Sequence, residues 1–258
     1  MSASGRLQGV GVVITRPREP AEAAARALER EGARAFVFPA LAIEDLEPTA
    51  ELEAALAALP EASLAIFVSA NAVERGLAAA RARAPWPAGV EVAAVGEATA
   101  EALRNSGFAH VISPSGRHDS DALLDTARLR SVRGENIIVF RGEGGRERLR
   151  QELESRGARV WYAQCYRRVR PAADPAALLA AWDRGAVHAV SALSAETLEN
   201  FVELVGPEGR ERLGAAALVV PHEAIAAHRD ARLFARVLVS AHGHEGLAES
   251  LVQLQVLT

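Results

Sequence analysis

The sequence predicts an α/β protein with two similar doubly wound lobes, each built on a parallel sheet. Short apolar segments alternate with helix-length segments along the 258 residues, which is typical of parallel sheets covered by helices. The chain also repeats itself at an offset of 125 residues, so that Ile14–Pro17 aligns with Val139–Gly142 and Gly32–Arg34 with Gly157–Arg159. Such a duplication predicts a cleft between the lobes, and ligands of open α/β folds usually lie at the carboxyl ends of strands.

The first repeat begins with a buried strand. Val10–Thr15 is short, apolar and rich in β-branched residues, as a strand covered on both faces should be. Pro17 and Pro20 favour the start of a helix, which Gly32 ends. The same signals predict further strands at 34–38, 63–69, 90–95 and 110–112, and helices at 50–59, 71–82, 97–107 and 119–126.

The second repeat follows the same plan. Its predicted strands are 136–140, 160–163, 186–191, 216–220 and 236–240. Its predicted helices are 146–155, 175–184, 194–205, 222–229 and 245–254.

Two extended segments occupy equivalent places, since each follows the second strand of its repeat. This equivalence predicts that the chain passes twice between the lobes, so that one lobe contains both chain ends. Two sequential domains of 125 residues each are the alternative. The predicted division is a flavodoxin-like lobe of residues 1–38 and 172–258, a second lobe of residues 42–163, and connectors at 39–41 and 164–171.

Composition narrows the function classes. The net charge of −4 provides no general basic field, so nucleic acid is not an expected partner. The lone cysteine, Cys165, excludes an internal disulfide framework and a multi-cysteine zinc site, and a reducing cytoplasm is the expected setting. No apolar run approaches the roughly 18 residues of a membrane span, so no membrane is expected as a partner. Nothing in the pattern requires assembly, and a monomer is expected.

Small and polar residues recur where a predicted strand ends and a helix begins. There the unpaired backbone N–H groups and the helix dipole can bind carboxylate or phosphate. Ordinary helix capping is the alternative interpretation of each such residue. The candidate substrate-binding residues are Thr15, Arg16, Ser69, Ala70, Asn71, Gly96, Thr99, Arg141, Gly142, Ser191, Ser194 and His222.

Three side chains carry more specific hypotheses. Arg16 and Arg141 are equivalent in the repeat, and each could pair bidentately with an acidic substrate, or else with an acidic side chain at the rim. Tyr166 lies in the second connector and could donate a proton to a leaving group, with plain hinge packing as the alternative.

Several common catalytic motifs are missing. The segment Arg141–Gly145 does not match G-x-G-x-x-G, and no Walker A loop, G-x-S-x-G elbow or H-E-x-x-H occurs. His242 and His244 flank a glycine and lack helical i, i+4 spacing, so they predict a loop and not a metal site. Cys165 is expected to be an inert buried thiol. We therefore expect an enzyme without cofactor, metal or covalent nucleophile.

Taken in order, these segments resemble the uroporphyrinogen-III synthase family over essentially the whole chain. The matching segments are Val13–Pro17, Phe67–Glu74, Ala94–Leu103, Ser120–Leu124, Val139–Gly142 and Gly157–Val160, followed by Tyr166, Arg167 and Pro171. The resemblance implies two α/β lobes joined by a two-stranded connector. It also implies cyclisation of hydroxymethylbilane, a linear tetrapyrrole with eight carboxylates, to uroporphyrinogen III, with inversion of the last ring, loss of water and no cofactor. Tyr166 matches the family's candidate proton donor.

The second repeat departs from the family pattern. Ser191–Ser194 stands where many members have a Thr/Ser-rich turn, and Val220–Ala224 where Gly and Thr are common. Pro221 removes one backbone donor there. Two other functions remain open: a non-catalytic two-lobe protein that binds a small polycarboxylate, and an interaction module of the response-regulator kind. The latter would need a phospho-acceptor aspartate after a strand, and none is evident.

Overall fold

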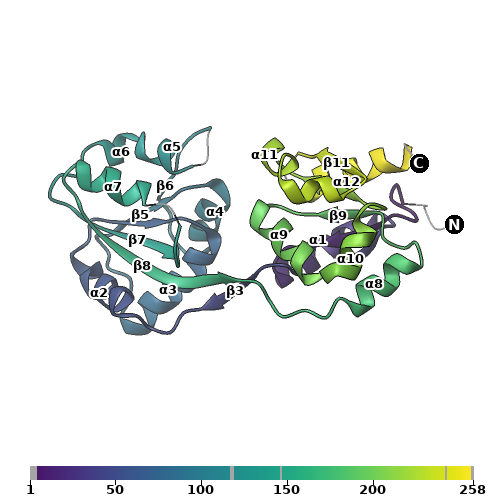
Figure 1. The fold of residues 1–258 in the computed structure, drawn as a ribbon. Coiled ribbons are helices and arrows are strands. Elements are labelled where there is room, and N and C mark those ends of the chain that lie inside the picture. Colours follow the sequence, from purple (N-terminus) through teal and green to yellow (C-terminus); the bar gives the residue numbers. More distant parts are fainter. Residues whose placement is uncertain (1–4, 117–118, 146, 242, 257–258) are drawn as a thin grey trace. The chain divides into compact units, whose positions relative to one another are not determined.

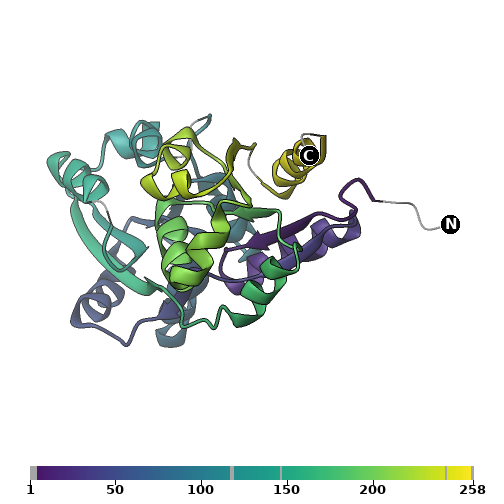
Figure 2. The ribbon, with the colours of Figure 1, turned by 45° about the vertical axis from the view of Figure 1, so that its right-hand side comes forward.

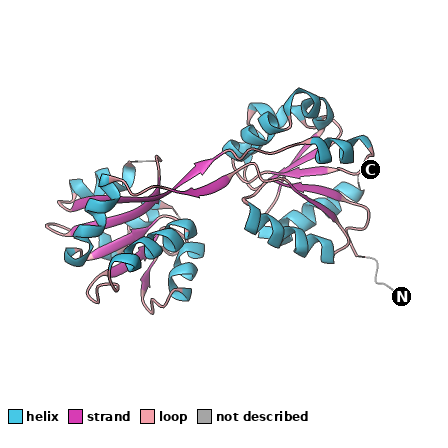
Figure 3. Ribbon diagram, turned by 90° about the horizontal axis from the view of Figure 1, so that it is seen from below, coloured by secondary structure: helices cyan, strands magenta, loops and turns pink. Residues whose placement is uncertain are grey.

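The chain folds into two compact α/β units. The computed structural model describes residues 5–116, 119–145, 147–241 and 243–256. Unit 1 joins the residues up to Ala42 with those from Val169 onward, and unit 2 comprises Ile43–Arg168. In each unit a sheet of mainly parallel strands lies between two layers of helices (Figures 1 and 3). The predicted fold class is confirmed.

The sheet of unit 1 combines strands from both ends of the chain, as the purple and the green-to-yellow segments of Figure 2 show. Its order is β11-β10-β9-β1-β2, and every pair is parallel. Val12 of β1 stands opposite Ala189 of β9. The strands are β1 (Gly11–Ile14), β2 (Arg34–Val37), β9 (Ala189–Ser191), β10 (Ala217–Val220) and β11 (Arg236–Val239).

Helices cover both faces of this sheet because its strands are apolar on both sides. Val12 and Ile14 pack toward α1 (Arg18–Arg30) and α12 (Gly243–Val256), which form the α1 face. Val13 packs toward the opposite side, the α9 face. The α9 face is formed by α8 (Ala176–Asp183), α9 (Ala195–Leu204), α10 (Gly206–Leu213), α11 (Glu223–Ala226) and the 3₁₀ turn Arg229–Leu233.

The sheet of unit 2 has the order β3-β8-β7-β4-β5-β6. From β8 to β6 the neighbouring strands are parallel. The strands are β3 (Ala42–Asp45), β4 (Leu64–Phe67), β5 (Glu91–Ala94), β6 (Val111–Ile112), β7 (Asn136–Gly142) and β8 (Arg159–Val169).

Helices also lie on both faces of this sheet (Figure 1). One, the α3 face, has α2 (Ala50–Ala58), the 3₁₀ turn Leu59–Glu61, α3 (Ala70–Arg83) and α4 (Glu97–Asn105). The Phe67 and Phe140 rings stack there with centroids 4.6 Å apart. The other, the α7 face, has α5 (Ser120–Leu124), α6 (Ala127–Arg130) and α7 (Arg148–Ser155).

Each unit combines strands from both sequence repeats. At the 125-residue offset, β1 and β2 correspond to β7 and β8, and β4 to β6 correspond to β9 to β11. The order β2-β1-β9-β10-β11 in unit 1 therefore repeats as β8-β7-β4-β5-β6 in unit 2. The unit boundary after Ala42 lies next to the predicted connector at 39–41, and the boundary after Arg168 lies within the predicted connector at 164–171.

β8 continues to Val169 and pairs with β3, so the two extended connectors are paired strands, in agreement with the two-stranded connector that the resemblance implies. Some helices differ from the sequence-based expectation. α10 was not predicted, although Pro207 in its first turn is a helix-start signal. The helix predicted at 222–229 is only the four residues of α11. Within the described ranges, no helix combines the length and apolar character needed to cross a membrane.

Gly11 provides a test of the unit 1 core. A Cβ atom at Gly11 would lie 1.7 Å from the carbonyl oxygen of Ala186, a backbone atom that no rotamer change can move. We expect Gly11→Ala to lower the free energy of unfolding by about 1–3 kcal/mol, as overpacking does. Urea unfolding measures this loss. Gly89→Ala is the control, because a Cβ there meets nothing within 4 Å, and equal stability of the two variants would contradict this packing.

Candidate functional site

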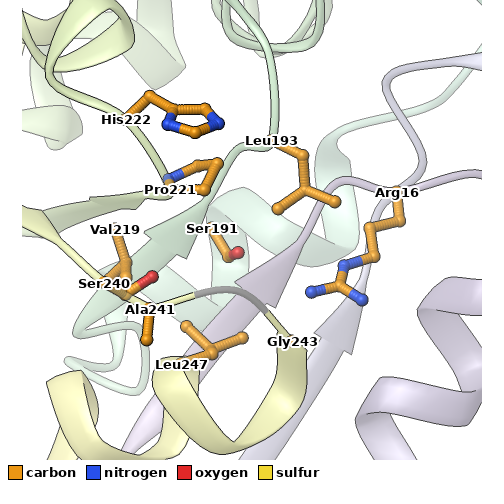
Figure 4. A pocket seen from close by; sticks show the side chains of 10 residues that line it. All are labelled: Arg16, Ser191, Leu193, Val219, Pro221, His222, Ser240, Ala241, Gly243 and Leu247. Atoms are coloured by element: carbon orange, nitrogen blue, oxygen red, sulfur yellow. The ribbon is translucent and has the colours of Figure 1, made fainter. Parts of the chain in front are cut away.

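The carboxyl ends of the unit 1 strands surround a pocket of about 210 Å³. Because the strands are parallel, the residues that follow them meet at one edge of the sheet. In Figure 4, Arg16 lies on one side of this pocket, Ser240 and His222 lie on the other, and Ser191 lies between them. The remaining lining residues are Leu193, Val219, Pro221, Ala241, Gly243 and Leu247.

Arg16 carries a positive charge that the described part of the protein does not balance. Its side chain is partly buried, and its Nε atom is buried without a hydrogen-bond partner. Burial lowers the pKa of the guanidinium from its usual value, because the charged form is poorly solvated. A buried charge without a partner is costly. An anion in this pocket would supply the missing partner.

Of the other predicted residues in unit 1, some make structural hydrogen bonds and others line the pocket. Thr15 is fully buried and donates from Oγ1 to the carbonyl oxygen of Ser191 at 2.6 Å, which ties β1 to β9. Ser194 caps α9 by accepting from the Thr197 backbone N–H at 3.1 Å. The side chain of Ser191 lines the pocket, as does the exposed His222 just before α11.

Sequence reasoning missed part of this pocket. Ser240 directly follows β11, and Ser191 is the last residue of β9. The search for polar residues at strand ends, which found Ser191, would therefore also have found Ser240. Leu247 lies in α12 and Leu193 in the turn after β9. No local pattern distinguishes these leucines from ordinary core or surface residues.

In unit 2 the structure brings two predicted residues together. The hydroxyl groups of Ser69 and Tyr166 are 2.9 Å apart and share a hydrogen bond. Ser69 Oγ also accepts from the Ala72 backbone N–H at 3.1 Å and so caps α3. Tyr166 is only 2% exposed. Its hydroxyl is thereby held at the carboxyl end of β4, beside the first turn of α3.

A β-bulge aims Tyr166 at this position. Tyr162 of β8 packs on the α7 face, and strict alternation would turn Tyr166 the same way. The register of β7 with β8 shifts beside Gly142, however. Cys165 and Tyr166 consequently both pack on the α3 face, and bulges commonly redirect side chains in this way.

Arg141 has a different environment from its repeat equivalent. It is 6% exposed. Its guanidinium donates to the carbonyl oxygens of Gly142 and Gly144 and pairs with Glu147 at 3.4 Å. It also stacks on the Tyr162 ring at 4.4 Å. Arg141 therefore organises the loop between β7 and α7, a role that the sequence equivalence with Arg16 does not reveal.

Tyr162 is a further residue that sequence reasoning missed. Arg150 of α7 also lies over its ring, with the guanidinium carbon 3.7 Å from the centroid. Burial raises the pKa of the Tyr162 hydroxyl. The ring thus attracts two arginines at the carboxyl end of β7, and only the fold brings these three residues together.

The remaining predicted residues of unit 2 lie at helix N-termini. Ala70 and Asn71 are in the first turn of α3. Gly96 is the N-cap of α4 without a side-chain cap bond, and Thr99 is 5% exposed in its first turn. Backbone N–H groups at such positions are of the kind that binds anions, although that of Thr99 also donates to the Gly96 carbonyl oxygen at 3.1 Å.

Comparison with known proteins identifies the family. The family model described as "Uroporphyrinogen-III synthase HemD" matches residues 22–252. The chain belongs to the uroporphyrinogen-III synthase family. The synthase of Salmonella typhimurium is 32% identical over 204 residues, covering 78% of this chain and 82% of that protein. The synthase of Escherichia coli is 29% identical over 203 residues, with the same coverage.

Solved structures support the fold. A mutant uroporphyrinogen III synthase from Thermus thermophilus has a TM-score of 0.60 at 21% identity, over 96% of this chain and all of that chain. The enzyme from Helicobacter pylori has a TM-score of 0.60 at 12% identity, over 95% and 99%. The predicted resemblance is confirmed. Members of the uroporphyrinogen-III synthase family are lyases of tetrapyrrole biosynthesis, so a non-catalytic binding protein is not favoured.

Among the described residues, Glu199, His228 and Asp230 form a group of side chains of the kinds that bind metal ions. Glu199 lies 3.0 Å from His228 Nε2, while Nδ1 accepts from the Asp230 backbone N–H at 3.3 Å. Arg229 also approaches both carboxylates. These contacts are typical of a hydrogen-bonded cap that ties the 3₁₀ turn at residue 229 to α9. Of the loop predicted at His242 and His244, His242 lies outside the described residues, whereas Gly243 and His244 belong to the first turn of α12, so the helix begins earlier than predicted.

Cys165 lacks the environment of a nucleophile. It is 6% exposed, and burial raises the pKa of its thiol to about 12. The thiol donates to the carbonyl oxygen of Arg141 at 3.5 Å. Because the thiolate is the reactive form, this residue is inert at neutral pH, as the sequence predicts.

This environment makes a prediction about thiol reactivity. We expect Cys165 to resist an aromatic disulfide reagent at pH 8 in the folded protein and to react within minutes in denaturant. The absorbance of the released thiolate measures both rates. Because the chain has a single cysteine, the signal needs no correction for other thiols. Rapid reaction of the folded protein would contradict the buried, protonated thiol.

Proposed function

We propose that this protein cyclises hydroxymethylbilane to uroporphyrinogen III, with inversion of the last pyrrole ring and loss of water. The family assignment supports the reaction. The structural observation that carries the proposal is Arg16, a partly buried guanidinium that lines a pocket and has no acidic partner among the described residues. A linear tetrapyrrole with eight carboxylates would provide that partner.

The pocket at Arg16 suits one substrate carboxylate. A guanidinium binds a carboxylate bidentately. The hydroxyl groups of Ser191 and Ser240 line the same pocket and can add hydrogen bonds. Pro221 contributes no N–H donor there, so His222 is the proposed polar group on that side.

In unit 2, Tyr166 is the proposed general acid. Its hydroxyl is held by Ser69, so it has one defined direction in which to donate or relay a proton. The helix N-termini at Ala70, Asn71, Gly96 and Thr99 are proposed to bind other substrate carboxylates through backbone N–H groups. A phenol is a weak acid, so its loss should slow the reaction without abolishing it.

The proposed reaction proceeds by loss and replacement of a leaving group. Protonation of the terminal hydroxyl releases water and leaves a cationic, electron-poor methylene. The last ring attacks this methylene through its substituted carbon to form a spiro intermediate, which rearranges to the inverted ring and loses a proton to give the neutral product. The protein's main task is to hold the chain so that simple closure is excluded. No electrons are gained or lost, so the reaction requires no redox cofactor. A monomer in the reducing cytoplasm remains the proposed working form.

Product analysis tests this function. After incubation with freshly generated hydroxymethylbilane, the oxidised products should be predominantly type III porphyrin, separated from type I by chromatography. Type I arises by unguided closure and is the expected product of a heat-denatured control. Type I alone from folded protein would exclude the proposed activity.

Substitution of Arg16 tests the carboxylate site. Arg16→Met should lower kcat/KM by about 10- to 100-fold, the usual effect of losing a charge-assisted hydrogen bond. The melting temperature of the free protein should stay equal or rise, because an unbalanced buried charge is removed. Arg18→Met is the control, since the Arg18 side chain is 74% exposed. A lower melting temperature with unchanged kcat/KM would mean that Arg16 is structural.

A further inference from the structure

We propose that Gly142 is a positioning residue for the reaction: the missing side chain at the end of β7 makes room for the ring of Tyr166 and so sets where its hydroxyl lies. This inference rests on the proposed function, because it takes Tyr166 as the proton donor. Gly142 contributes to the site because it has no Cβ atom.

The space beside Gly142 is filled by the tyrosine ring. A Cβ atom at Gly142 would lie 2.6 Å from Cε2 and 2.8 Å from Cζ of Tyr166. Carbon atoms in contact are normally separated by about 3.5–4.0 Å. Any other residue at this position would therefore push the ring away. Cζ carries the hydroxyl, so the displacement would act directly on the hydrogen bond to Ser69.

The backbone conformation does not require glycine at this position. Gly142 is not among the glycines with positive φ, so an L-residue could adopt its conformation. The repeat equivalent of Gly142 in unit 1 is Pro17, and the corresponding strand end accommodates a full ring there. The specific reason for glycine in unit 2 is the approach of Tyr166.

Tyr166 is anchored through its backbone and buried in the core. The carbonyl oxygen of Tyr166 accepts from the Glu143 backbone N–H at 2.7 Å, which anchors its backbone to the end of β7. The preceding thiol of Cys165 bonds to Arg141 across the same strand pair. The side chain is 2% exposed within the α3-face core. A methyl group at Gly142 must therefore be accommodated by tilting the ring, which moves the hydroxyl most.

Tyrosine labelling tests the geometry without using activity. The chain has only two tyrosines, so protein labelled with 3-fluorotyrosine gives two ¹⁹F signals. Tyr162→Phe and Tyr166→Phe assign them. In Gly142→Ala the Tyr166 signal should shift while the Tyr162 signal stays, and in the control Gly89→Ala neither should shift.

Kinetics test the consequence. Gly142→Ala should lower kcat by up to about 100-fold, the scale of a misplacement of about 1 Å, and should increase the fraction of type I product. KM should change little, because the carboxylate contacts remain. In the background of Tyr166→Phe, Gly142→Ala should have little further effect on kcat, because the effects of substituting residues that act together are not additive.

Stability provides a second measurement if Gly142→Ala folds poorly. The loss in melting temperature should be large with Tyr166 present and small in the background of Tyr166→Leu, which has no ring to clash.

Each outcome has a distinct meaning. An unmoved Tyr166 signal, or an equal stability loss in both backgrounds, would overturn the inference. A shifted signal in Gly142→Ala with full kcat, while Tyr166→Phe is slow, would also overturn it. If Tyr166→Phe itself retained full kcat and type III product, the proposed acid role would fail, and the shifted signal would still establish that Gly142 positions the ring.

Discussion

The parallel alignment of strands is the constraint on which the rest of this structure depends. In each unit, parallel pairing brings the carboxyl ends of successive strands to one edge of the sheet, and a helix begins soon after most of them. Polar side chains, helix N-termini and buried charges therefore gather at that edge even though they are far apart in sequence. Arg16 and Ser191 become neighbours in unit 1 for this reason, as do Ser69 and Tyr166 in unit 2.

Residues at equivalent positions of the two repeats have different roles. Arg16 and Arg141 occupy equivalent places in the two units, yet Arg16 has no acidic partner among the described residues, whereas Arg141 is held by contacts with its own loop. The difference arises from neighbours outside the repeat pattern. A glycine-rich loop and the Tyr162 ring surround Arg141, whereas Arg16 faces an open pocket. Arg141 thus supports the structure of its loop, whereas Arg16 is the arginine that we propose to bind an anion.

Periodicity predicted most of the fold, because buried parallel strands and capped helices leave local signals. Strand-end polarity likewise predicted residues at each sheet edge, including Ser69 and Ser191, whereas Tyr166 was predicted from its place in the second connector. The sequence could not show that Thr15 is used internally, because its partner is a carbonyl oxygen 176 residues away. The β-bulge that turns Tyr166 was also hidden, since a single shift in register leaves no compositional mark. Function came from the ordered set of motifs, as no single residue identifies the reaction.

The discontinuity of unit 1 has a consequence for synthesis on the ribosome. The first 42 residues contribute β1, α1 and β2, but β1 also pairs with β9, which is translated much later. Unit 2 is contiguous and has all its strands as soon as residue 168 has left the exit tunnel. Until then the apolar residues of β1 and α1, such as Ile14 and Leu28, lack the core partners that β9, β10 and α12 provide. The nascent chain is therefore most exposed to aggregation at its amino end, and completion of unit 1 is a late, long-range step.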